Sequence, residues 1–295
     1  MSLAVSLIAP SSYTDPKAVA AGIRGLSSLG VEVRVVEPLQ APERYLAGSR
    51  ERRLAQLHAA YDDPASQAVW AVRGGYGAAQ LVAGIDWARL ADHPKPLIGY
   101  SDVTVLLDQC HRRGLPAIHG PVAKAAGGLL AGDADRREVI RRQFEETLEL
   151  IRGGVPLDYP LIAHRPAPPS LQGPVVGGNL ATLASLIGTP AAFRAAPGAL
   201  VILEDVGEPY YRLERALWQL VHAGALDEAA AVCLGTFEGC PPYGETTLEA
   251  IFTKTLASLA LPLFSGLPIG HGLHNRPWRY GATGRIENGC LSIAA

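Results

Sequence analysis

The chain has 295 residues, 48% of them apolar and 18% charged, and a formal net charge of -2. This composition allows a large buried core and excludes general disorder, and the length predicts two domains or one large one. The near balance of 26 basic and 28 acidic residues provides no field of one sign for nucleic acid or an anionic membrane. No apolar run approaches the length of a membrane span. We therefore expect neither nucleic acid nor a membrane as a partner.

The four cysteines, Cys110, Cys233, Cys240 and Cys290, include no CxxC pair. This spacing indicates neither a zinc ribbon nor a thioredoxin-like site, and it favours reduced thiols in a cytosolic protein. The first apolar run is short, lacks a basic start and is interrupted by Pro10, which is typical of a strand rather than a signal peptide. We therefore expect a cytoplasmic protein.

The first half of the chain alternates strand-like and helix-like segments. Strands are predicted near 5–9, 31–36, 68–72 and 96–99, and helices over 17–29, 51–61, 78–90 and 103–110. This alternation predicts an α/β domain with a parallel sheet that helices cover on both faces. The charged stretch 131–150 predicts an exposed helix.

The proline-rich and glycine-rich stretch 151–173 has the composition of a linker. We therefore place an N-terminal domain over 1–150, a linker over 151–173 and a C-terminal domain over 174–295. Within the C-terminal domain, Asn288 and Gly289 lie between two apolar runs and predict a hairpin with a type I′ turn. Further strands are predicted near 174–176, 199–203 and 229–234, and helices over 180–187, 211–222 and 246–259.

The motif Gly99-Tyr100-Ser101-Asp102 lies at a predicted strand-to-helix junction. A serine at such a bend is lifted out of the sheet, beside the free amides of the helix N-terminus. The backbone N–H of Asp102 is then a candidate oxyanion donor. The match to G-x-S-x-G is partial because Val103 replaces the second glycine. An ordinary helix N-cap remains the alternative role for Ser101.

The motif Arg73-Gly74-Gly75-Tyr76-Gly77 follows another predicted strand. Its glycines allow the backbone to approach a ligand and to turn amides toward it. We expect Gly74 or Gly75 to supply a second oxyanion donor. Neither a P-loop nor a complete G-x-G-x-x-G motif is present, and a plain tight turn is the alternative.

Glu204 and His271 complete the set of candidate catalytic residues. Glu204 directly follows a buried strand, where sites of α/β proteins form, although an acid there can also complement a helix dipole. His271 lies between two glycines and is sterically open, although a lone histidine is often structural. His271 and His274 form an HxxH pair, but no third ligand stands at a familiar spacing, so we expect no metal.

The order serine, carboxylate, histidine is known from one group of nucleophilic hydrolases. A serine hydroxyl is almost un-ionised at neutral pH and needs a base within hydrogen-bond reach. The imidazole in turn needs a carboxylate that fixes its tautomer and stabilises its cation. This chemistry predicts Ser101 as nucleophile, His271 as base and Glu204 as the orienting carboxylate.

Taken together, the motifs resemble the LD-carboxypeptidase family, serine peptidases of murein recycling that are related to the microcin C self-immunity peptidases. The resemblance runs over nearly the whole chain, in matching order. The residues that carry it are Ile8-Ala9-Pro10-Ser11, the motifs at 73–77 and 99–104, His119-Gly120-Pro121, Gly177-Gly178-Asn179-Leu180, Leu203-Glu204-Asp205-Val206-Gly207-Glu208 and Gly270-His271.

The resemblance implies an N-terminal α/β domain with a class I amidotransferase-like sheet and a smaller C-terminal domain that is mixed, β-rich or barrel-like. It implies the same roles for Ser101, Glu204 and His271, and an active site between the domains. It also implies a cytoplasmic homodimer without metal or cofactor. The expected substrate is a muropeptide tetrapeptide, cut between the L-centre of meso-diaminopimelate and the terminal D-Ala.

Arg276 and Arg279 are candidates to bind a terminal carboxylate, because arginine offers it a planar fork, and an exposed, solvated arginine is the alternative. Further substrate contacts are expected at Arg73 and Tyr76. The chain departs from the family pattern in the loop 275–280, where an arginine, Arg279, occupies the usual position of a proline.

Three alternatives stay open at this point. A microcin C-type immunity peptidase would cleave an aminoacyl-nucleotide amide bond and stack the nucleobase on Trp278 or Tyr280. A non-catalytic, two-lobed ligand-binding protein would use the region 151–174 as a hinge. A dinucleotide-dependent enzyme is disfavoured by the incomplete glycine fingerprint.

Overall fold

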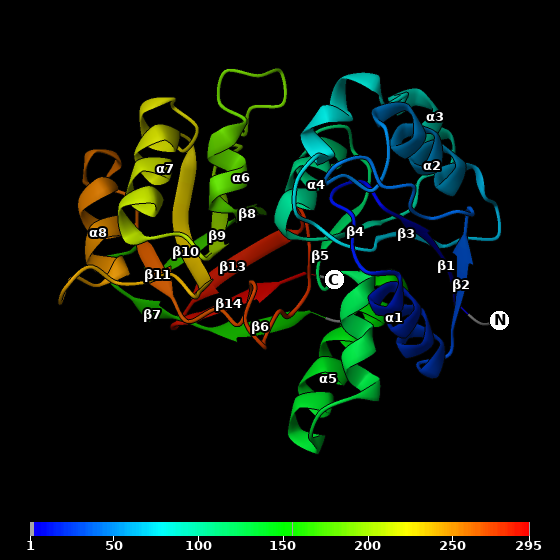
Figure 1. Cartoon of the computed structure of the whole chain (residues 1–295). Helices are drawn as coiled ribbons and strands as arrows, with labels where there is room; N and C mark the ends of the chain where they lie inside the picture. The colour runs from blue at the N-terminus through cyan, green and yellow to red at the C-terminus, as the bar shows by residue number, and fades with distance from the viewer. Residues whose placement is uncertain (1–2, 155, 295) are drawn as a thin grey trace. The chain divides into compact units, whose positions relative to one another are not determined.

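The computed structural model describes residues 3–154 and 156–294. The chain divides into two compact units (Figure 1). The first contains Met1–Gly154 and Arg276–Trp278, and the second contains Val155–Asn275 and Arg279–Ala295. Among the described residues, no helix combines the length and the apolar character that crossing a membrane requires.

The first unit is built on a six-stranded sheet in the order β12-β5-β4-β3-β1-β2. The pairs formed among β1 to β5 are all parallel. Every residue of β1 and β3 is buried, as expected for strands that helices cover on both faces. The strands are β1 (Leu3–Ile8), β2 (Val31–Val35), β3 (Ala68–Ala71), β4 (Leu97–Gly99), β5 (Ala117–His119) and β12 (Trp278–Arg279).

Polar side chains begin the longer helices of this unit. Asp15, Ser49 and Asp133 each accept a hydrogen bond from a backbone amide in the first turn of the helix that follows. The α-helices are α1 (Pro16–Ser28), α2 (Arg50–Asp62), α3 (Trp87–Asp92), α4 (Thr104–His111) and α5 (Ala134–Ile151). The 3-10 helices are η1 (Ala78–Gln80), η2 (Val82–Gly84), η3 (Ser101–Val103) and η4 (Ala123–Leu130).

Two expectations for the helices of this unit are wrong. The single helix predicted over 78–90 is divided into η1, η2 and α3, because Gly84 weakens it and the Asp86 side chain caps a new helix start at the Arg89 amide. The charged helix α5 is not simply exposed. It buries one apolar face that includes Ile140, Phe144 and Leu148.

The second unit contains an eight-stranded mixed sheet in the order β6-β14-β13-β8-β9-β10-β11-β7. Its four central strands, β8 to β11, are parallel, and the pairs toward both edges are antiparallel. Its strands are β6 (Leu157–Pro160), β7 (Ile162–Ala163), β8 (Ser170–Asn179), β9 (Ala199–Val206), β10 (Ala229–Glu238), β11 (Leu263–Ser265), β13 (Thr283–Glu287) and β14 (Cys290–Ile293).

Three α-helices, α6 (Leu180–Ser185), α7 (Tyr210–His222) and α8 (Leu248–Thr255), pack side by side along the parallel strands, and the 3-10 helix η5 (Ala257–Leu259) follows α8 (Figure 1). The predicted hairpin is confirmed as β13 and β14, with Asn288 and Gly289 at positive φ angles of 51° and 72°. The first unit has a parallel α/β sheet and the second unit is mixed and β-rich, so the predicted fold class is confirmed.

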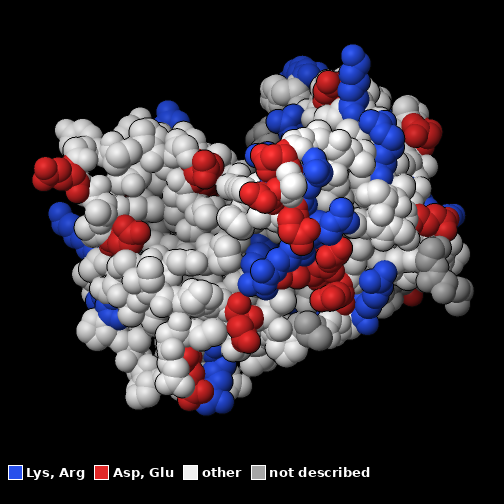
Figure 2. All heavy atoms as spheres, turned by 90° about the horizontal axis from the view of Figure 1, so that it is seen from below, with Lys and Arg blue, Asp and Glu red and all other residues white. Residues whose placement is uncertain are grey.

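The stretch expected as a linker, 151–173, contains β6, β7 and the beginning of β8. Only one of its prolines, Pro160, lies within these strands, and it ends β6, an edge strand of its sheet, where proline is tolerated. Acidic and basic side chains are interspersed on the face that Figure 2 shows, in keeping with the small net charge.

Candidate active site

Ser101 lies at a sharp turn where β4 ends and η3 begins. Tyr100 is extended, with φ -157°, whereas Ser101 has φ +63°, a left-handed conformation that residues other than glycine rarely adopt. Tyr100, and not Ser101, occupies the cap position of η3, and no side-chain cap bond forms there. The N-cap alternative for Ser101 is therefore wrong. The unusual φ marks the turn as a functional candidate.

The glycine loop lies directly against this turn. A β-carbon on Gly74 would lie 2.8 Å from Cβ and 3.0 Å from Oγ of Ser101, and 3.2 Å from the backbone nitrogen of Asp102. Gly75 has φ +111°, and a β-carbon there would lie 2.5 Å from Oγ of Ser12. The structure thus brings together Ser101, the Asp102 amide and Gly74, whereas Gly75 lies against Ser12. The glycines allow the loop to touch the serine turn itself, a reason the sequence did not reveal.

The two other candidate residues of this loop differ in exposure. The Arg73 guanidinium is half-buried and donates a hydrogen bond to the carbonyl of Tyr13. The Tyr76 ring is 52% exposed and meets the Tyr45 ring edge-on, with 5.6 Å between the ring centroids. Tyr76 therefore presents an accessible aromatic surface two residues after Gly74, which lies against Ser101.

Glu204 and His271 form a hydrogen-bonded pair in the second unit. Nδ1 of His271 lies 2.6 Å from Oε2 of Glu204, across 67 residues of sequence. Glu204 is completely buried near the end of β9, and the His271 side chain is 14% exposed. A buried carboxylate is costly without a partner, so this bond stabilises both groups. When Nδ1–H donates to Glu204, Nε2 is the nitrogen of the neutral ring that can accept a proton.

A strand irregularity and a glycine make room for this pair. The register of β9 and β10 shifts between Leu234 and Phe237, opposite Glu204, as in a β-bulge next to an active site. Gly270 has φ +138°, and a β-carbon there would lie 3.0 Å from Oε2 of Glu204 and 2.4 Å from Oγ1 of Thr236. Only glycine fits at 270 without disturbing the carboxylate.

Two residues beside Glu204, Asp205 and Asn179, were not predicted as parts of the site. The buried carboxylate of Asp205 accepts hydrogen bonds from Nδ2 of Asn179 at 3.0 Å and from the Ala181 amide at 2.8 Å. Burial raises the pKa of Asp205, and the neighbouring Glu204 adds to the rise. Asn179 in turn caps α6 through the Thr182 amide. The signal was present in Gly177-Gly178-Asn179 before a helix, a pattern typical of a helix cap.

The candidate contacts near the C-terminus are engaged within the protein. Arg276 forms an ion pair with Glu146 of α5, with Nη2 and Oε1 2.7 Å apart, and Arg279 is half-buried at the end of β12. Trp278 is fully buried and stacks on His119, and Tyr280 is buried and accepts a hydrogen bond from the Gly177 amide. The expectation that Trp278 or Tyr280 stacks on a nucleobase is wrong, because neither ring is accessible.

His274, the other histidine of the HxxH pair, is exposed. The part of the chain that the structure describes contains no group of three or more histidine, cysteine or acidic side chains arranged to hold a metal ion. All four cysteines are free thiols, and three of them are buried.

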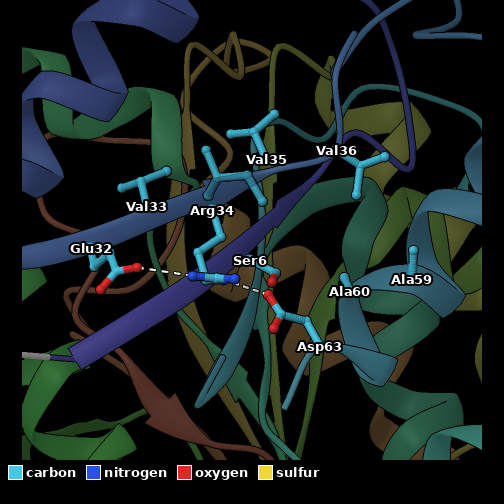
Figure 3. A pocket seen from close by; sticks show the side chains of 10 residues that line it. Ser6, Glu32, Val33, Arg34, Val35, Val36, Ala59, Ala60 and Asp63 are labelled. Atoms are coloured by element: carbon cyan, nitrogen blue, oxygen red, sulfur yellow. Dashed lines mark hydrogen bonds and ion pairs between the residues drawn. The ribbon is translucent and has the colours of Figure 1, made fainter. Parts of the chain in front are cut away.

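A cavity of about 300 Å³ in the first unit lies apart from the Ser101 turn, between the edge strand β2 and α2 (Figure 3). The charged group that points into it, Arg34, is held by Glu32 and Asp63. Its remaining lining is mostly valine and alanine. The paired charges leave this cavity without an evident ligand-binding group, so the Ser101 turn remains the candidate site of the first unit.

Both halves of the chain match known domains of one protein family. The profile of the LD-carboxypeptidase N-terminal domain matches residues 5–120, and that of the LD-carboxypeptidase C-terminal domain matches residues 172–286. The chain is 43% identical to the murein tetrapeptide carboxypeptidase of Pseudomonas aeruginosa, over 97% of this chain and 94% of that protein. It is 33% identical to a probable murein peptide carboxypeptidase of Bacillus subtilis, over 90% and 83% of the two chains.

Solved structures of similar proteins match the fold over nearly the whole chain. The muramoyltetrapeptide carboxypeptidase of Oxalobacter formigenes matches with a TM-score of 0.85 and 27% identity, over 99% of both chains. MccF in complex with glutamyl sulfamoyl guanosine matches with a TM-score of 0.88, over 100% of this chain and 96% of that one. Its identity of 18% supports a shared fold alone.

Proposed function

Because the chain belongs to the LD-carboxypeptidase family, we propose that it is a serine carboxypeptidase that removes the terminal D-Ala from muropeptide tetrapeptides. The relative from Pseudomonas aeruginosa, 43% identical over nearly the full length of both chains, supports this substrate class. The observation that carries the chemistry is the 2.6 Å bond between His271 and the buried Glu204. Such a pair supplies a base of fixed tautomer, which is what a serine nucleophile requires.

In the proposed reaction, the hydroxyl of Ser101 attacks the carbonyl carbon of the bond before D-Ala, while Nε2 of His271 takes its proton. The backbone amides of Asp102 and of Gly74 or Gly75 stabilise the resulting oxyanion. His271 then gives the proton to the amine of the leaving D-Ala, and the tripeptide remains as an ester on Ser101. A water molecule, deprotonated by His271, hydrolyses this ester and releases the tripeptide. Glu204 stabilises the imidazolium in both steps.

Arg73, Tyr76, Arg276 and Arg279 remain proposed substrate contacts. Tyr76 is the best supported of the four, because its ring is exposed and its loop touches Ser101. Arg276 would have to exchange its ion pair with Glu146 for a substrate carboxylate.

The proposal also covers the oligomeric state of the protein and its compartment in the cell. The family resemblance suggests a homodimer in the cytoplasm. Light scattering coupled to gel filtration measures the mass of the particle, and fractionation of cells that express the chain measures its compartment. A monomer, or a protein recovered outside the cytoplasm, would remove these two parts of the proposal without affecting the reaction.

The reaction is tested by incubating the purified protein with a D-Ala-terminated muropeptide tetrapeptide and following the products by mass spectrometry. We expect loss of one alanine and release of the tripeptide. Ser101→Ala should abolish this loss, whereas Ser185→Ala, which removes an exposed hydroxyl at the end of α6, should not. An aminoacyl sulfamoyl adenosine forms a parallel arm. Turnover of that compound alone would replace murein processing with the immunity-peptidase function.

A further inference from the structure

We propose that the carboxylate of Asp102 is a positioning group, which ties the glycine loop 73–77 to the nucleophile turn and so places the amides that stabilise the oxyanion. The role of the loop in catalysis rests on the proposed function. The tie itself is a property of the first unit alone. It differs from the role of the Asp102 backbone amide, because it depends on the side chain.

The tie is a hydrogen bond from the end of the loop to the residue after Ser101. Oδ2 of Asp102 accepts from the backbone N–H of Ala78 at 2.9 Å, across 24 residues. Asp102 is only 7% exposed, so this bond is shielded from water. Ala78 directly follows Gly77 and begins η1. Asp102 therefore holds the chain at the residue directly after the loop, while Gly74 lies against Ser101 near the start of the loop.

Arg53 of α2 holds the same end of the loop from another side. It is 2% exposed, and its Nη1 donates to the carbonyls of Gly77 at 2.8 Å and Pro10 at 2.6 Å. A β-carbon on Gly77 would lie 2.8 Å from this nitrogen. The guanidinium also provides a positive charge near Asp102. The loop is thus fixed by a buried acid and a buried base.

Burial of Asp102 opposes its charged form, and the groups around it offset part of that cost. Burial raises the pKa of Asp102, and the Ser11 hydroxyl, the amides of Ala78 and Gly77 and the charge of Arg53 oppose that rise. A buried carboxylate adds little net stability compared with an apolar residue. Its contribution here is better explained by geometry, because no apolar side chain can accept the Ala78 hydrogen bond.

Loss of the tie should affect the transition state more than substrate binding. Oxyanion donors act only where charge develops, so displacing them lowers kcat while KM changes little. Removing one oxyanion donor typically costs about 10²–10³ in kcat. We expect a loss of about 10²-fold for Asp102→Ala, since the loop is displaced and not deleted. Asp102→Asn keeps one acceptor oxygen and should recover part of that loss.

The experiment measures kcat, KM and amide hydrogen exchange of peptides that span 73–81 in the wild type, Asp102→Ala and Asp102→Asn. The matched control is Asp108→Ala, which removes another buried carboxylate of the same region that bonds to Arg112 and Gln109. We expect faster exchange over 73–81 and lower kcat at nearly constant KM in both Asp102 variants. The Asp108 variant should change neither.

Unchanged exchange over 73–81, or a rise in KM at constant kcat, would overturn the proposal. An equal loss of kcat in Asp108→Ala would also overturn it, because the effect would then be one of general stability. If Asp102→Ala does not fold, the same readouts on Asp102→Asn decide. Should the wild type fail to cleave the tetrapeptide, the proposed function is lost, whereas the exchange measurement still tests the tie.

Discussion

Gly74 leaves no space for a side chain beside Ser101. A β-carbon there would lie 2.8 Å from Cβ and 3.0 Å from Oγ of Ser101, closer than such atoms pack. Ser101 itself has a positive φ, and its β-carbon, which the backbone fixes in place, cannot move away without altering the turn. A side chain at position 74 is therefore incompatible with the present turn at Ser101.

Gly74→Ala should lower kcat severely while the rest of the protein stays folded. The added methyl group would push against Ser101 and approach the Asp102 amide, one of the proposed oxyanion donors. We expect a loss of about 10²-fold or more, because misplacement of about 1 Å at a reacting group can cost that much. Steady-state kinetics and thermal unfolding measure the two properties. Wild-type kcat in a folded Gly74→Ala protein would contradict the proposed geometry.

Glu204→Gln should abolish most turnover and leave substrate binding nearly unchanged. The amide keeps the size of the carboxylate but cannot stabilise the imidazolium, and it can hold His271 in the wrong tautomer. The equivalent change in a serine protease lowers kcat by about 10⁴. Comparing kcat and KM with those of the wild type checks this expectation. A fall in kcat of less than tenfold would show that Glu204 only supports the fold.

Gly270→Ala should damage stability and activity together. The alanine would have to adopt φ +138° and bring its β-carbon to 2.4 Å from Oγ1 of Thr236 and 3.0 Å from Oε2 of Glu204. The backbone strain alone costs about 1–3 kcal/mol. Urea unfolding and kcat measure the two losses. Adding Thr236→Ala to Gly270→Ala should restore neither the stability nor kcat fully, because the backbone strain and the close contact with Glu204 remain.

Asp108 should make the stability of the protein depend on pH. Burial raises the pKa of the Asp108 carboxyl from 3.8 to about 6, against the opposing effect of Arg112. A raised pKa in the folded state means that the stabilisation is complete below about pH 4 and is lost as the pH rises through about 6. Asp108→Asn cannot ionise, so it should gain stability relative to the wild type over this range, by up to about 3 kcal/mol. Urea unfolding at both ends of the range measures the difference, and a constant difference would contradict the assignment.

The parts of the fold that depend on local patterns could be predicted from the sequence. The buried strand β3 is a uniform apolar run and β1 is apolar except for Ser6, and Asn288 and Gly289 define their turn without help from the rest of the chain. The helix expected over 78–90 failed because one glycine and one new cap divide it, and periodicity does not register such breaks.

The candidate site also contains residues that could be predicted from the sequence and contacts that could not. Ser101, Glu204 and His271 were identified from their places after strands and their order, and the bond between Glu204 and His271 agrees with the roles inferred for them. The support around them could not be predicted. The bond from Ala78 to Asp102 spans 24 residues, and that between Arg276 and Glu146 spans 130. Pairings of this kind depend on how loops meet in space, which residue types and spacing do not encode.

Labelling with a fluorophosphonate tests most directly whether His271 activates the Ser101 hydroxyl, because the reagent forms a stable adduct only with an activated serine. Peptide mapping by mass spectrometry should find one adduct per chain, on Ser101, at a rate that falls by orders of magnitude in His271→Ala. An adduct on another residue, or labelling of Ser101 at the same rate without His271, would contradict the catalytic assignment.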